Sequence, residues 1–167
     1  MPEATWVCAD VLTVPSMLLR PFDTAIANPP FGPVRRANNG PGYRGPRFEY
    51  HVITVASRLA RHGVFLVPQQ SAPFSHSGKP CYIEDPDIEY RKFHSATGIL
   101  LEAGCSVDTT CYDQDWHHRP PATEVAVCDF TVLPEAPAST DRRPASTARR
   151  FSRPITTPPQ LVGPSVA

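Results

Sequence analysis

Short apolar runs alternate with longer amphipathic stretches along this chain, and that alternation predicts a layered α/β fold. Residues 5–9 (TWVCA), 24–27 (TAIA) and 64–67 (VFLV) have the length and apolar character of strands. Residues 107–112 and 124–132 predict two further strands, and the polar connection between them lacks a helical pattern. We therefore expect these last two strands to form an antiparallel hairpin at the end of the sheet.

Two segments switch to the spacing of a helix. The first has apolar residues on one helical face, with His62-Gly63 at its end: Phe48, Val52, Val55, Ala56, Leu59 and Ala60. The second has the same spacing and ends at Gly104: Tyr90, Phe93, Thr97, Leu100 and Leu101. Residues 32–47 and 69–87 are broken by Gly and Pro and are predicted loops. The expected order is strand, strand, helix, strand, helix, strand, strand.

Composition divides the chain near residue 133. Residues 134–167 contain seven of the 21 prolines and five arginines, but only two acidic residues and few large apolar side chains. Such a segment lacks the apolar surface that offsets the entropy of ordering, so we expect a disordered Pro/Arg-rich tail. Residues 1–133 are the expected domain, with a net charge of −3. This charge excludes a globally basic architectural nucleic-acid binder.

The sequence lacks the patterns of a membrane span, a signal peptide and a zinc site, and these absences bear on cellular location and metal content. No run approaches the 18 apolar residues of a membrane span, and the first residues do not form a signal peptide, so we expect a cytoplasmic protein outside the membrane. The odd number of cysteines, with no C-x-x-C pair, favours isolated buried thiols over a disulfide framework or zinc site. These cysteines are Cys8, Cys81, Cys105, Cys111 and Cys128. We expect no metal.

The most informative stretch is residues 22–31 (FDTAIANPPF), where an apolar strand ends in a polar residue. Ligands of open α/β sheets bind at the carboxyl ends of strands. The side-chain oxygen of Asn28 and the carbonyl of Pro29 are hydrogen-bond acceptors, and Phe31 offers a flat face for stacking. Two acceptors beside a ring suit an exocyclic amino group on a planar heterocycle. A plain strand-to-loop turn, ended by proline, is the alternative.

Asn28-Pro29-Pro30-Phe31 resembles the catalytic motif of amino-methyltransferases that use S-adenosylmethionine. That family includes DNA adenine-N6 methylases and related RNA and protein-glutamine enzymes. The resemblance implies Asn28 and Pro29 as acceptors for the target amine, Pro30 as a rigid turn and Phe31 as the ring that stacks on the target base. It covers about residues 5–133. The implied fold is the C-terminal half of a Rossmann-like methyltransferase sheet, mostly parallel with an antiparallel terminal hairpin.

Two further sets of residues take roles beside that motif. Residues 6–12 (WVCADVL) resemble the preceding family motif, which implies Asp10 and Val11 beside the cofactor's adenine; an acid after a strand can also cap a turn. Four arginines lie on the loop that leaves the motif, and arginine binds phosphate well, so we predict nucleic-acid contacts, with solvated charges as the alternative. These arginines are Arg35, Arg36, Arg44 and Arg47.

The chain also departs from the family. Members carry a Gly-rich turn after their first strand and an acid after their second, and neither precedes Asp10. We therefore expect a truncated or split methyltransferase acting on adenine in DNA, with a missing N-terminal half or partner subunit. Adenine in duplex DNA would be flipped out of the stack. The alternatives are an inactive nucleic-acid-binding relic or subunit, and a methyltransferase for RNA or protein glutamine.

Overall fold

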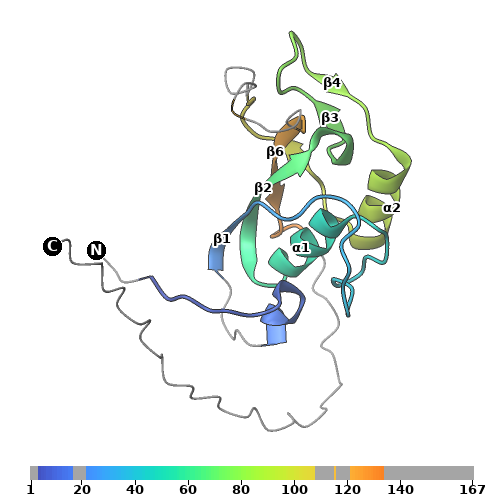
Figure 1. Cartoon of the computed structure of the whole chain (residues 1–167). Helices are drawn as coiled ribbons and strands as arrows, with labels where there is room; N and C mark the ends of the chain where they lie inside the picture. The colour runs from blue at the N-terminus through green and yellow to red at the C-terminus, as the bar shows by residue number, and fades with distance from the viewer. Residues whose placement is uncertain (1–3, 17–21, 108–114, 116–120, 134–167) are drawn as a thin grey trace, which may run out of the picture. The chain divides into compact units, whose positions relative to one another are not determined.

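The computed structural model describes residues 4–16, 22–107, 115 and 121–133 (Figure 1). It has the mixed α/β character that the hydrophobic pattern predicts. In chain order the elements are η1 (Val11–Ser16), β1 (Phe22–Ala27), α1 (Phe48–Ala56), β2 (Ala60–Pro68), η2 (Gln69–Ser71), β3 (Phe74–Ser75), β4 (Ile83–Glu84), α2 (Ile88–Thr97), β5 (Glu102–Ala103) and β6 (Thr123–Asp129). The predicted tail, residues 134–167, lies outside the described residues.

Four strands form one sheet in the order β1-β2-β6-β5. β1 and β2 are parallel, whereas β6 runs antiparallel to both of its neighbours, β2 and β5. β1, β2 and β5 therefore share one direction and β6 alone is reversed. The expected antiparallel strand near the end of the sheet is confirmed, although it lies between two strands of the opposite direction. The only parallel ladder among the described residues is that of β1 and β2.

The core lies on one face of this sheet. Alternate residues of the two central strands point to that face and are buried, namely Phe65 and Val67 of β2 and Ala126 and Cys128 of β6. They form one cluster with Tyr50 and Ile53 of α1 and with Tyr90 and Phe93 of α2. The rings of Tyr50 and Phe93 stack with centroids 4.3 Å apart, which joins the two helices. Both helices therefore cover the same side of the sheet.

The opposite face has no such cover among the described residues. Ile26 of β1 pairs in register with Val64 of β2, which pairs with Val127 of β6, so three apolar side chains form a row across the sheet. Ile26 is 80% exposed, and Val64 and Val127 are only partly buried. The outer edge of β1 pairs with no described strand. Parallel strands are normally buried on both faces, so the exposure of Ile26 departs from the usual environment of a parallel strand.

Both helices end earlier than the apolar spacing predicts. The first helix ends at Ala56, because Ala60 already pairs with Phe22 and the next residues form the sheet ladder of β2. The second helix ends at Gly98 and not at Gly104. Gly98 has φ = 72° and its N–H donates to the carbonyl of His94, which is the usual geometry of a glycine that ends a helix.

One predicted strand is not found, and another lies almost entirely outside the described residues. Residues 5–9 form no strand and are exposed, with Trp6 at 92%, because no described strand supplies backbone hydrogen bonds to them. The partner of β6 in the terminal hairpin is the short β5, whereas Val107 lies outside any strand and residues 108–112 lie outside the described residues. The predicted loop at 69–87 contains η2 and the antiparallel pair β3–β4.

The cysteines also correct an expectation. Cys8, Cys81 and Cys105 are exposed, which makes the interpretation as buried thiols wrong for these three. Cys128 is buried, and burial raises the pKa of its thiol to about 12. Cys111 lies outside the described residues. Within the described ranges, neither α-helix has the length and apolar character needed to cross a membrane.

Candidate functional site

The predicted tetrad Asn28–Phe31 begins where β1 leaves the sheet. The last paired residue of β1 is Ala27, opposite Phe65, while β2 continues to Pro68. Prolines cannot donate to a strand ladder, so pairing stops at this point. Asn28 and Pro30 are exposed, Pro29 is buried and Phe31 is partly buried. The tetrad therefore lies at the carboxyl end of a sheet strand, with the Asn28 side chain open to a ligand.

A buried carboxylate that the sequence analysis missed holds the residue after this tetrad. Gly32, with φ = 73°, donates its N–H to Oε2 of Glu49 at 2.8 Å, and its carbonyl accepts from Phe48 N–H at 2.8 Å. The other oxygen of Glu49 accepts from the hydroxyl of Ser71 at 2.7 Å. Glu49 is fully buried. One side chain at the start of α1 thus connects the turn after β1 to the segment after β2.

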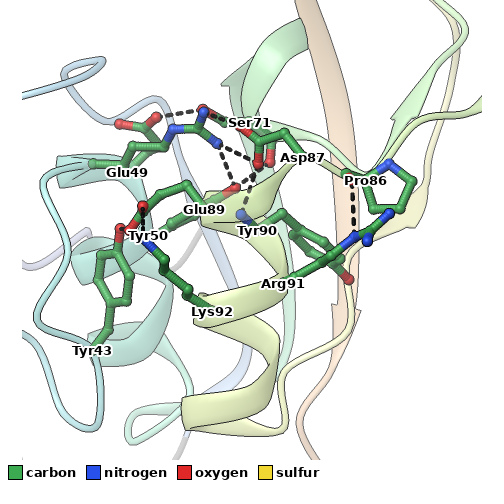
Figure 2. A network of polar contacts seen from close by, with 11 residues as sticks. Tyr43, Glu49, Tyr50, Ser71, Pro86, Asp87, Glu89, Tyr90, Arg91 and Lys92 are labelled. Carbon is green, nitrogen blue, oxygen red and sulfur yellow. Dashed lines mark hydrogen bonds and ion pairs between the residues drawn. The ribbon is translucent and has the colours of Figure 1, made fainter.

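A second network of polar contacts connects Ser71 with the start of α2 (Figure 2). The hydroxyl of Tyr50 donates to the carbonyl of Ser71 at 2.7 Å and accepts from Arg47 at 3.1 Å. Arg47 also forms an ion pair with Asp87, whose Oδ1 accepts from the N–H of Tyr90 at 2.7 Å as the cap of α2. Burial alone would raise the pKa of Asp87, but the hydrogen bonds from Arg47 and Tyr90 lower it below its ordinary value.

The loop that follows the tetrad is built around His51, which is fully buried. Nδ1 of His51 accepts from the N–H of Gly40 at 2.8 Å, and Nε2 donates to the carbonyl of Gly45 at 2.9 Å. This arrangement requires the neutral imidazole, and burial lowers its pKa. A side chain at Gly40 would overlap Thr54 and the backbone of His51. The loop therefore covers the polar side of α1, and all nine residues of α1 are buried.

The four loop arginines divide into two pairs. Arg47 bonds Asp87 and Tyr50, and Arg36 donates to the carbonyl of Gly45 at 2.8 Å and to Oδ1 of Asn39 at 3.1 Å. These two guanidinium groups stabilise the loop itself. Arg35 and Arg44 are exposed and have no recorded hydrogen bond to a described residue. Of the four, they are the pair whose guanidinium groups are open to a phosphate.

Asp10 begins the turn η1. Its Oδ1 accepts from the N–H of Leu12 at 3.0 Å, and its carbonyl accepts from Thr13 N–H at 2.9 Å. Asp10 is exposed and Val11 is partly buried. No hydrogen bond between described residues connects Asp10 with the tetrad. The geometry is that of a local cap, which was the simpler of its two interpretations.

A cleft lies at the same edge of the sheet, after β2. Its volume is about 380 Å³, and its lining includes Gln70, Phe74, Ser75, Lys79, Asp85 and Asp87. Gln70 is next to Ser71, which shares the carboxylate of Glu49 with Gly32. The carboxylate of Glu49 thus bonds both the residue that follows the tetrad and the residue that follows Gln70 of the cleft. Among the described residues, no group of three or more His, Cys, Asp or Glu side chains is placed to hold a metal ion.

No family model, no curated protein and no solved structure matches this chain. A functional assignment therefore depends on the residues of the site and on the arrangement of the sheet that presents them.

Proposed function

We propose that this chain is a cytoplasmic protein comprising the amine-binding half of an S-adenosylmethionine-dependent methyltransferase that acts on the exocyclic amine of adenine in DNA. The observation that carries the proposal is Asn28, exposed at the carboxyl end of β1 and followed by Pro29, Pro30 and Phe31. The sheet supports it. The order β1-β2-β6-β5, with β6 reversed, fits the C-terminal half of a Rossmann-like methyltransferase sheet.

The residues of the tetrad would bind and orient the amine. The side-chain oxygen of Asn28 and the carbonyl of Pro29 would each accept one N–H of the amine, which turns the nitrogen lone pair out of the plane of the ring. Phe31 would stack on the adenine after it leaves the duplex. S-adenosylmethionine would supply an electrophilic methyl group. Glu49 would be a positioning residue, because its carboxylate holds Gly32, the residue after the tetrad, and not the substrate.

The cofactor side of such a site is incomplete in the described residues. No described strand opens into a Gly-rich turn, and the cofactor candidates of this chain are Asp10 and Val11. The carboxylate of Asp10 already caps its own turn. The described residues therefore do not fit a full S-adenosylmethionine site.

A complementing N-terminal half or partner subunit would supply the missing part of the sheet. The free edge of β1 and the exposed row at Ile26 are suited to a further strand and a covering helix. That no described strand opens into a Gly-rich turn is also the observation that favours the alternative, an inactive relic or subunit that retains substrate contacts.

Among the candidate substrates, we favour a nucleic acid over a protein. Arg35 and Arg44 are exposed on the loop that leaves the tetrad, and their guanidinium groups suit phosphate. DNA is preferred to RNA, while RNA adenine and protein glutamine remain alternatives because the same tetrad suits each amine. Comparing methyl transfer to DNA, RNA and a glutamine-containing peptide distinguishes them.

Calorimetric titration of S-adenosylmethionine into the purified chain is the first experiment. Saturable binding would mean that the chain forms a usable pocket alone or as a dimer. If the folded chain does not bind S-adenosylmethionine, the result would favour a site that needs a complementing half. Methyl transfer would then be measured in the complete assembly.

Transfer of labelled methyl groups to DNA tests the role of Asn28 directly. In the complete assembly, we expect Asn28→Ala to abolish transfer with little loss of stability, because the residue is exposed at a strand end. Asn38→Ala, at an exposed asparagine in the following loop, is the matched control and should transfer normally. Wild-type turnover by Asn28→Ala would remove the catalytic assignment.

A further inference from the structure

The β3–β4 hairpin lies beyond the carboxyl end of β2 (Figure 1). Tyr82 lies directly before β4, and its ring stacks on Phe74 with centroids 5.9 Å apart and planes 20° apart. His76 meets the same ring edge-on at 6.1 Å. Phe74 is buried, yet Tyr82 is 48% exposed. Tyr82 is therefore supported on one side and available to a planar ligand on the other.

The base of the hairpin is fixed to the sheet by Glu124 of β6. Its buried carboxylate accepts from Gln69 Nε2 at 2.6 Å, from His76 N–H at 2.8 Å and from Ser77 N–H at 3.0 Å. Burial alone would raise the pKa of Glu124, but these hydrogen bonds lower it below its ordinary value, so the group is ionised at neutral pH. The hairpin is thus held by a charged acceptor before any ligand binds, which lowers the ordering cost of binding.

The cleft beside the hairpin has the size and polarity for one nucleotide. Its volume of about 380 Å³ is near the lower end for ligand sites. Its lining combines the amide of Gln70, the ammonium of Lys79 and the carboxylate of Asp85, all exposed side chains. A glutamine amide can pair with a base edge, and a lysine ammonium can contact phosphate.

We propose that Tyr82 and the cleft at Gln70 bind an unpaired nucleotide of the substrate strand, with Tyr82 stacking on the base and Gln70 bonding its edge. This inference rests on the proposed function for one point, that the substrate is a nucleic acid. A base must leave its stack before an aromatic side chain can cover its face. The site would therefore prefer single-stranded or flipped nucleotides to closed duplex.

Fluorescence anisotropy with a labelled single-stranded DNA of about 12 nucleotides tests the inference on the chain alone, without cofactor. We expect Tyr82→Ala to weaken binding by about tenfold or more, and Tyr82→Phe, which keeps the ring, to bind like wild type. Gln70→Ala should weaken binding to adenine-containing strands more than to polypyrimidine. Ile88→Ala is the matched control, because Ile88 is 72% exposed on α2 and lies outside the cleft.

The outcomes separate this inference from the proposed function. Equal binding by wild type and Tyr82→Ala, or no binding of single-stranded DNA by a folded chain, would overturn the role of Tyr82 whatever the methyl-transfer result. Tyr82-dependent binding of a glutamine-containing peptide in place of DNA would overturn it too. Tyr82-dependent DNA binding, combined with normal transfer by Asn28→Ala, would instead support this site and remove the proposed catalytic one.

Discussion

Glu49 accepts a hydrogen bond of 2.8 Å from the backbone N–H of Gly32, and the two residues are 17 positions apart in the chain. Gly32 directly follows Phe31, the last residue of the Asn28–Phe31 tetrad. The conformation of the turn after β1 therefore depends on a carboxylate buried at the start of α1. The same carboxylate accepts from Ser71, so both strand ends of the candidate site share one acceptor.

Replacing this carboxylate should destabilise the whole domain. Glu49→Ala leaves the N–H of Gly32 and the hydroxyl of Ser71 without their buried acceptor, which we expect to cost about 2–4 kcal/mol of unfolding free energy. Glu49→Gln keeps one acceptor oxygen and should cost less. Urea unfolding measures both, with Glu84→Ala as a control at an exposed position of β4. A Glu49→Ala protein as stable as the control would contradict the structural role.

Asp87 both caps α2 and pairs with Arg47, and two substitutions separate these contributions. Asn is a good helix cap and Ala is not, so Asp87→Asn should lose only the ion pair, whereas Asp87→Ala should lose both. We expect the Ala variant to be about 1 kcal/mol less stable than the Asn variant. Thermal or urea unfolding of the two proteins gives this difference directly. Equal stabilities would mean that the cap at Tyr90 contributes nothing.

Acid should weaken the loop that His51 supports. Burial lowers the pKa of His51 from its ordinary value of 6.5. Protonation would also remove the acceptor that the N–H of Gly40 uses. The unfolded chain then takes up a proton that the folded chain resists, so the free energy of unfolding falls as pH drops below 6.5. Urea unfolding at about pH 7.5 and about pH 5.5 measures this loss.

Two histidine variants isolate the effect of His51. His51→Gln should lose part of the pH dependence, whereas His62→Gln, at an exposed position, should keep it. An identical slope in the two variants would assign the pH dependence to other groups.

Because one face of the sheet is uncovered among the described residues, we expect substitutions of two apolar residues to change the unfolding free energy by very different amounts. Ile26→Thr should change the unfolding free energy by less than about 0.5 kcal/mol, since Ile26 is 80% exposed. Val67→Thr places a hydroxyl among buried side chains of the opposite face and should cost about 1–3 kcal/mol. Urea unfolding of the isolated chain tests both. A comparable cost at Ile26 would mean that this face is covered in solution.

The sequence by itself determined several local elements and the residues that are candidates for the site. An apolar run ending in Asn28, followed by two prolines and Phe31, is enough to predict a strand that stops at a polar residue. Apolar residues at helical spacing near Phe48 and Tyr90 are enough to predict α1 and α2. Each of these patterns reports interactions between residues that are near in sequence, where steric limits and burial act locally.

Only the tertiary structure decided which partners those elements found. Residues 5–9 have the composition of a strand but form none, because a strand needs hydrogen bonds from a neighbour, and no described strand lies beside them. The pattern also gives no sign that Glu49 and His51 are buried, since their acceptors and donors come from a loop that folds back on α1. Long-range contacts also divide the four loop arginines, because Arg36 and Arg47 bond other residues of the domain while Arg35 and Arg44 remain exposed. Whether a side chain stabilises the fold or stays open to a ligand depends on contacts between residues far apart in the sequence. The spacing of residues along the chain does not report those contacts.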